Sequence, residues 1–223
     1  MSFLRQVLAI AHKDVIAEFR SREIITSVLV FAALVLIIFN FAFSVDTATM
    51  ALIAPGVLWV AFTFAGVLAL NRTFIPEKEE GCLDGLLACP VRREAIYMGK
   101  VLGGLSFLLV VEAVIMPIFS LLFDINVFQV EVLIATVLGT VGFTAVGAVF
   151  AALAVNTRAR EMVLPVLFLP IVSPVIIAAV ESSAIALSGG SFRDMAMWLI
   201  IIVAFDIIFL TVSFLVFSYV IEE

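Results

Sequence analysis

The sequence has few charged residues for its length. Charged residues make up 13% of the 223 residues and hydrophobic residues 65%, whereas about a quarter of a soluble domain is charged. A soluble chain of this size would need a polar coat, but here the polar residues are confined to a few short stretches. The shortage of charge therefore excludes an ordinary water-soluble domain and predicts a protein whose main solvent is lipid. The net charge of −6, with no basic patch outside short loops, also argues against nucleic-acid binding.

Metal-binding side chains are nearly absent. His12 is the only histidine, and a metal site normally needs several ligands, so no metal site is predicted. Cys82 and Cys89 lie in a segment that we place in the cytoplasm, where thiols stay reduced, so we expect no disulfide.

The motifs of nucleotide-binding and catalytic sites are also missing. The only Gly-Lys pair, Gly99-Lys100, is followed by valine, and Glu94 stands where a phosphate-binding loop needs glycine. There is no Gly-x-Ser-x-Gly, His-Glu-x-x-His or Cys-x-x-Cys motif. We therefore predict a non-catalytic membrane subunit, with any ATP hydrolysed by another chain.

Long apolar runs predict an all-α integral membrane protein of six transmembrane helices, folded as one membrane domain over residues 1–223. The first run, Ile24 to Phe43, has 20 uncharged residues, enough for a helix to cross a hydrocarbon core of about 30 Å. The expected spans are about 24–43, 48–70, 101–123, 131–155, 162–180 and 195–220. A loop is expected over 181–194, around Gly189-Gly190.

The basic residues predict the orientation. Eleven of the 12 Lys and Arg residues lie before the first span, between spans two and three, or between spans four and five, and only Arg193 lies on the other side. Because basic residues favour the cytoplasmic side, both ends of the chain are expected in the cytoplasm. Apolar residues of 1–23 recur at helical spacing with charges between them, which favours an amphipathic elbow helix at the membrane surface. The alternative is a cytoplasmic extension of the first span.

The segment 76–90, PEKEEGCLDGLLACP, predicts a short cytoplasmic coupling helix. Proline and glutamate suit the first turn of a helix, and Pro90 ends it. An amphipathic helix held between two spans suits a groove on a motor subunit. The alternative is a helix resting on lipid headgroups, which its four acidic residues disfavour. The candidate ATPase-coupling residues are Glu77, Glu79, Glu80, Cys82, Leu83, Asp84, Leu86 and Leu87.

The run IAPGVLWVAFTFAGVLALNRTF, residues 53–74, followed by EKEEGCLDGLLACP, resembles the haem exporter B (CcmB) family. The motif residues are Pro55, Gly56 and Trp59. The resemblance implies an ABC-2 type permease of cytochrome c maturation in the bacterial inner membrane. It implies as partners a CcmA-like ATPase that uses the ATP, a second permease copy, CcmC-like and CcmD-like haem-handling membrane proteins and a CcmE-like haem chaperone. It also implies haem as a candidate cargo, no covalently bound cofactor, and ATP use in either haem delivery or chaperone release.

Two acidic residues, Glu112 and Asp206, fall within predicted spans. A charged side chain there costs about 3 kcal/mol, so each acid is expected to be either neutral and hydrogen-bonded to another helix or facing a wet cavity. Four prolines are hinge or kink candidates, although kinks are also tolerated in membrane helices without a function. They are Pro117, Pro165, Pro170 and Pro174.

Small residues at four-residue spacing mark the fourth span, where they predict close helix packing. They are Thr140, Thr144, Ala148 and Ala152, with Gly139, Gly142 and Gly147 beside them. Trp59 and Trp198 are expected to be anchors at the membrane interface.

Two other functions stay open. One is an ABC-2 type exporter of another cargo, such as a lipid-linked glycan or a drug. The other is a membrane scaffold that assembles haem-handling proteins and transports nothing.

Overall fold

The computed structural model describes residues 2–20, 22–43, 47–70, 85, 89–156 and 164–222, and these form helices without any strand. The helices are α1 (Phe3–Arg20), α2 (Arg22–Ala42), α3 (Thr47–Leu70), α6 (Arg93–Phe123), α7 (Val130–Asn156), the π-helix η1 (Leu164–Phe168), α9 (Leu169–Leu187) and α10 (Phe192–Glu222). Six helical segments are long and apolar enough to cross a membrane. The chain is therefore a multi-pass membrane protein, as the apolar runs predict.

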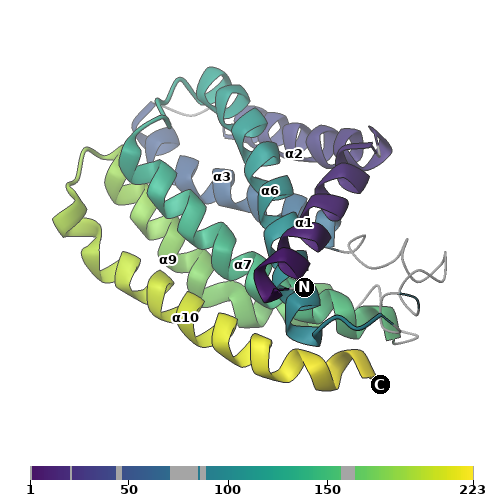
Figure 1. The fold of residues 1–223 in the computed structure, drawn as a ribbon. Coiled ribbons are helices and arrows are strands. Elements are labelled where there is room, and N and C mark those ends of the chain that lie inside the picture. The colour runs from purple at the N-terminus through teal and green to yellow at the C-terminus, as the bar shows by residue number, and fades with distance from the viewer. Residues whose placement is uncertain are drawn as a thin grey trace.

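α7 occupies the centre of the helix bundle. It packs against α6, α3, α9 and α10, and α7, α9 and α10 run side by side in Figure 1. Most of α7 is buried, whereas only a small part of α2 and of α10 is buried. Because the exposed residues of α2 and α10 are themselves apolar, these outer helices present the surface that a lipid bilayer requires.

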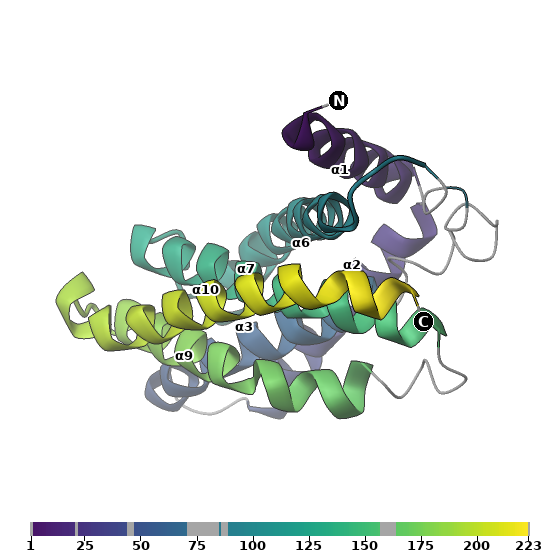
Figure 2. The ribbon, with the colours of Figure 1, turned by 60° about the horizontal axis from the view of Figure 1, so that its bottom comes forward.

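α1 lies on the outside of this bundle. It crosses α6 in Figure 1, and Figure 2 shows it above α6, away from α3 and α9. Its main neighbour is α6, with fewer contacts to the start of α2. α1 is a separate helix over residues 3–20 that ends before α2 begins, and its placement as an elbow at the membrane surface stays a prediction.

The third span begins eight residues earlier than the sequence indicates. The expected start is Val101, but α6 already begins at Arg93. Pro90 precedes it, and Arg92 has extended backbone angles, as is common just outside a helix start. The charge on Lys100 does not end the helix, because this side chain is buried in an ion pair with Asp14.

The fifth span also differs from the expectation. α9 continues to Leu187, so residues 181–187 are helix and the predicted loop over 181–194 is wrong. Ser183 does not interrupt the helix, because its hydroxyl donates a hydrogen bond to the Ala179 carbonyl at 2.7 Å. The turn comes at Gly189, whose φ of 82° suits glycine.

The start of the fifth span is irregular, as its prolines predict. A π-helical turn, η1, contains Pro165, and Pro170 stands in the first turn of the following α-helix. Proline removes a backbone donor from the ladder, which explains the break at this point. Pro117 and Pro174 instead lie inside continuous α-helices, so they are tolerated there. A hinge role for any of the four stays a prediction.

Candidate functional site

The candidate ATPase-coupling residues lie outside the described residues, so the docking surface stays a prediction. The structure does describe the residues that come next in the chain. Cys89 and Pro90 are exposed, and Val91 and Arg92, the second with extended backbone angles, then lead directly into α6. Movement of the coupling segment would therefore act on α6 with almost no intervening loop.

Two contacts from α1 hold the short segment that leads into α6. Gln6 Nε2 donates a hydrogen bond to the Pro90 carbonyl at 3.4 Å, and the Arg92 guanidinium lies 5.5 Å from the centre of the Phe3 ring. The same ring contacts Phe214 of α10 edge-on at 6.3 Å. One end of α1 thus touches both the entry to α6 and the last turns of α10.

Glycines on α6 let α1 approach closely. A side chain at position 99 would meet Ile10, with Val7 O at 3.2 Å, and one at position 103 would meet Asp14 Cβ at 3.0 Å. Val7 and Ile10 are buried in this contact. The two helices pack nearly backbone to backbone over these turns, so α1 is a fixed part of the fold.

A charged cluster is buried in the same interface. Asp14 Oδ2 lies 3.2 Å from Lys100 Nζ, and Asp14 Oδ1 lies 2.9 Å from Lys13 Nζ. The Lys100 side chain is only 1% exposed. The pKa of the nearby Glu18 is raised to about 7, mainly by burial and then by the Asp14 charge, while the Lys100 charge acts in the opposite direction.

The Asp14–Lys100 pair was not predicted from the sequence, although one signal pointed to it. Asp14 falls at helical spacing with the apolar residues Val7, Ile10 and Ala11, and an acid on an apolar helix face needs a partner. That partner could not be named because Lys100 is 86 positions away. His12, by contrast, is exposed on α1, and the part of the chain that the structure describes brings together no metal-binding group of side chains.

Glu112 is buried where α6 meets α7. Its Oε1 accepts a hydrogen bond from Thr140 Oγ1 at 2.7 Å, which is the hydrogen-bonded alternative expected from the sequence. The same hydroxyl also lies 2.8 Å from the Thr136 carbonyl, but it has only one hydrogen. A protonated Glu112 that donates to Thr140 would satisfy both contacts, with Thr140 donating to Thr136.

Asp206 lies on the other side of α7. Its Oδ1 occupies the space that a side chain at position 142 would fill, and this oxygen has no hydrogen-bond partner among the described residues. Thr140 and Gly142 are about 200° apart around α7. The two acids therefore face opposite sides of one helix and do not form a carboxylate pair.

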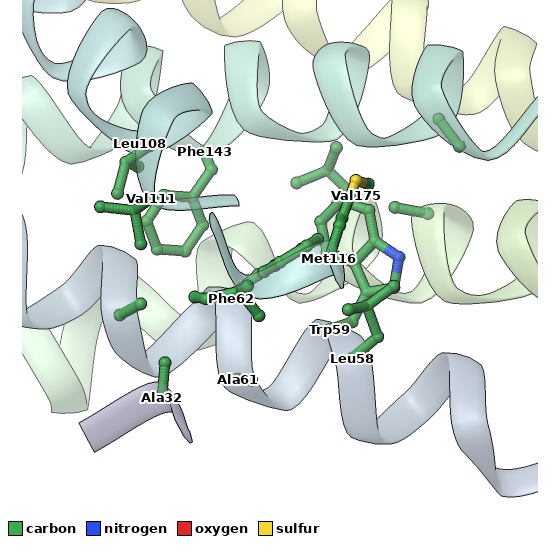
Figure 3. Packing of buried hydrophobic residues seen from close by; sticks show 14 of the residues in the cluster. Ala32, Leu58, Trp59, Ala61, Phe62, Leu108, Val111, Met116, Phe143 and Val175 are labelled. Carbon is green, nitrogen blue, oxygen red and sulfur yellow. The ribbon is translucent and has the colours of Figure 1, made fainter. Parts of the chain in front are cut away.

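Trp59 is a packing residue in the bundle, not the interface anchor expected from the sequence. Its side chain is 3% exposed, and its Nε1 donates a hydrogen bond to Ser183 Oγ of α9 at 3.0 Å. The ring fills the space left by Gly139 of α7. Figure 3 shows Trp59 among the buried apolar side chains, with Phe62 beside it. Trp198 is half-buried against the same core.

The glycines of α7 explain this close packing. Beyond the Trp59 contact at Gly139, a side chain at position 147 would meet Leu70 of α3, and Phe143 of α7 in turn lies over Gly66 of α3. Thr140, Thr144, Ala148 and Ala152 are all buried. The close helix packing predicted from the small residues is confirmed.

Comparison with known proteins identifies the family. The model of the CcmB protein family matches residues 5–222. The chain belongs to the CcmB family. It is 28% identical to the heme exporter protein B of Pseudomonas aeruginosa over 81% of this chain and 82% of that protein. It is 31% identical to the heme exporter protein B of Paracoccus denitrificans over 69% and 71%, and 32% identical to that of Escherichia coli K12 over 38% of each.

The family motif of this CcmB chain lies on α3. Pro55 is buried inside the helix, Gly56 is partly buried, and a side chain at position 56 would meet no atom within 4 Å. Within the described residues, Trp59 has a specific partner in Ser183. Trp59 of the motif therefore contributes to the packing of α3 against α7 and α9.

Proposed function

We propose that the chain is the permease subunit of an ABC transporter in cytochrome c biogenesis. It acts with a separate ATPase in haem delivery or in release of a haem chaperone. The observation that carries this proposal is the CcmB family match over residues 5–222, which spans all six membrane helices. The relatives named heme exporter protein B make haem the first cargo to test.

The protein is a multi-pass protein of the bacterial inner membrane, and the basic residues support an orientation with both ends in the cytoplasm. Among the described helices, Arg5, Lys13 and Arg20 lie on α1 and Arg93 lies at the start of α6. Arg193 lies at the start of α10, where the chain re-enters the bundle at its other end (Figure 1). The positive-inside bias therefore favours a cytoplasmic location for α1 and for the segment between α3 and α6.

In this orientation the segment 76–90 is within reach of a cytoplasmic ATPase. Its acidic first half and its leucines suit a groove with basic and apolar walls. Nucleotide-driven movement of the ATPase would push this segment, and Pro90 and Arg92 would pass the movement to α6 and, through Phe3, to α1. Repacking of α6 and α1 is the kind of helix shift that can switch a permease between two states.

The proposed assembly contains a second copy of this chain, a CcmA-like ATPase, CcmC-like and CcmD-like membrane proteins and a CcmE-like chaperone. The chain itself supplies no catalytic group and no bound cofactor. Labelled haem that crosses proteoliposomes of the complex would support transport. ATP turnover without such movement would instead favour the scaffold, and movement of a glycolipid or a drug would favour the other exporter.

Charge reversal of the coupling segment tests the proposal. In Glu79→Lys/Glu80→Lys/Asp84→Lys, the acidic face that fits the ATPase becomes basic, so we expect the ATPase to be lost from the purified complex and cytochrome c yield to fall with it. The control is Glu181→Lys, an exposed acid of α9 near the other end of the bundle, which should keep the ATPase. Full ATPase retention by the triple variant would contradict the docking surface.

A further inference from the structure

We propose that the outward face of α1 binds anionic phospholipids of the membrane leaflet on its side of the bundle. The outward face consists of Leu4, Leu8, Ile16 and Phe19 together with Arg5, Lys13 and Arg20. The proposal deepens the proposed function, because it rests on the orientation that places α1 at the cytoplasmic surface.

α1 has two apolar faces: among the described residues α6 covers one of them and meets the other only at its edge, where the Phe19 ring contacts Phe107 edge-on at 6.3 Å. Val7, Ile10 and Ala11 are buried against α6. The second face is exposed in the described part of the chain: the exposed fraction is 65% for Leu4, 54% for Leu8, 51% for Ile16 and 41% for Phe19. At 3.6 residues per turn these four residues fall within about 120° of one another, directly beside the buried face, since Leu4 is about 20° from Ala11. A second apolar stripe of this kind suits the boundary between headgroups and acyl chains.

The charges of α1 are sorted between its two sides. Arg5, Lys13 and Arg20 are exposed, whereas Asp14 is buried against Lys100 and Glu18 is half-buried close to it. The acids therefore face α6, and the side of α1 that faces outward carries positive charge. Basic side chains beside an exposed apolar stripe attract an anionic lipid surface.

The same charge pattern disfavours the other occupants of this face. An ATPase groove that accepts the acidic segment 77–84 would itself be basic and would repel Arg5 and Arg20. A second copy of the chain in a two-fold contact would bring the same basic face against itself. Anionic lipid is the occupant that satisfies both the apolar stripe and the cations.

Local fluorescence quenching in nanodiscs tests the proposal with the full chain. Cys82 and Cys89 are replaced by serine, and a fluorophore is attached at Leu8→Cys. Quenching by doxyl-labelled phosphatidylglycerol is then compared with quenching by doxyl-labelled phosphatidylcholine. We expect phosphatidylglycerol to quench more strongly and high salt to reduce the difference. A fluorophore at Phe41→Cys, an exposed position near the end of α2, should be quenched equally by both lipids.

Charge removal sharpens the test. Arg5→Gln and Arg20→Gln should each lower the preference for phosphatidylglycerol about fivefold, whereas Arg193→Gln, at the start of α10, should leave it unchanged. Equal quenching by both lipids at position 8 would overturn the proposal. So would the absence of quenching, or its loss on addition of the ATPase, because the face would then be covered by protein. None of these readouts requires transport, so they are independent of the test of the proposed function.

Discussion

The protein buries acidic side chains in two regions and surrounds them differently. Between α1 and α6, Asp14 lies within ion-pair distance of Lys13 and Lys100. Inside the bundle, Glu112 meets a threonine hydroxyl, and Asp206 lies against the backbone of α7 at Gly142. From this difference we predict that charge is compensated by a cation near the proposed cytoplasmic surface, while the acids inside the bundle are held without a full charge. Four substitutions test this difference.

Removal of the cation at the α1–α6 interface should have the largest effect. Lys100→Met leaves Asp14 buried beside a single, half-exposed lysine, and breaking a buried ion pair costs about 3 kcal/mol or more. We expect a large drop in the thermal denaturation midpoint of the purified protein and release of α1, seen as faster hydrogen exchange in residues 3–20. The double variant Asp14→Leu/Lys100→Met should recover much of the loss. If Lys100→Met alone is harmless, the pair does not hold α1.

The second largest loss of stability should come from a larger side chain beside Asp206. Gly142→Ala places a methyl group where Asp206 Oδ1 lies, and Phe205 Cδ1 and Val175 Cγ2, at 3.1 and 3.3 Å, restrict its escape. Such overpacking costs about 1–3 kcal/mol, which a lower denaturation midpoint would report. Gly104→Ala is the matched control on α6, because a side chain there meets nothing within 4 Å. Equal behaviour of the two variants would show that Asp206 can move aside easily.

Neutral replacement of the intramembrane acid should change stability least among the buried acids. Glu112→Gln keeps the shape of the side chain and supplies an amide donor for Thr140, so a cost below about 1 kcal/mol is expected. A loss as large as that of Lys100→Met would show that Glu112 is ionised and compensated. Cytochrome c yield measured on the same variant tests function: normal yield at normal protein level would remove Glu112 from the mechanism.

A pH dependence of α1 docking should be the smallest effect, because Glu18 is only half-buried and solvent screens its interactions. Because burial raises the pKa of Glu18 from 4.5 to about 7, the protonated form is favoured when α1 is docked. The stabilisation is complete below about pH 4.5 and is lost as the pH rises through about 7. Hydrogen exchange in residues 3–20, corrected for its intrinsic pH dependence, should therefore accelerate between about pH 5 and 8 by this contribution. Glu18→Gln should remove the acceleration, and an unchanged pH profile would exclude Glu18 as its source.

The six spans could be predicted from the sequence because each is a long apolar run with at most one charged residue, a property local to the chain. The start of α6 was misplaced because Lys100 looks like a loop residue until its partner Asp14 is seen. The role of Trp59 was wrong for a similar reason: the space for its ring comes from Gly139, 80 positions away. The coupling segment and the hinge prolines stay predictions, since their roles depend on a partner chain or on movement.

The central claim is that the segment between α3 and α6 faces the compartment of the ATPase. Cys89, exposed just before α6, tests it directly in a chain with Cys82→Ser, using a maleimide that cannot cross membranes. We expect labelling of Cys89 in inverted membrane vesicles and none in spheroplasts. Labelling in spheroplasts, with none in inverted vesicles, would show the opposite topology. The segment would then lie in the periplasm, where a cytoplasmic ATPase cannot bind it.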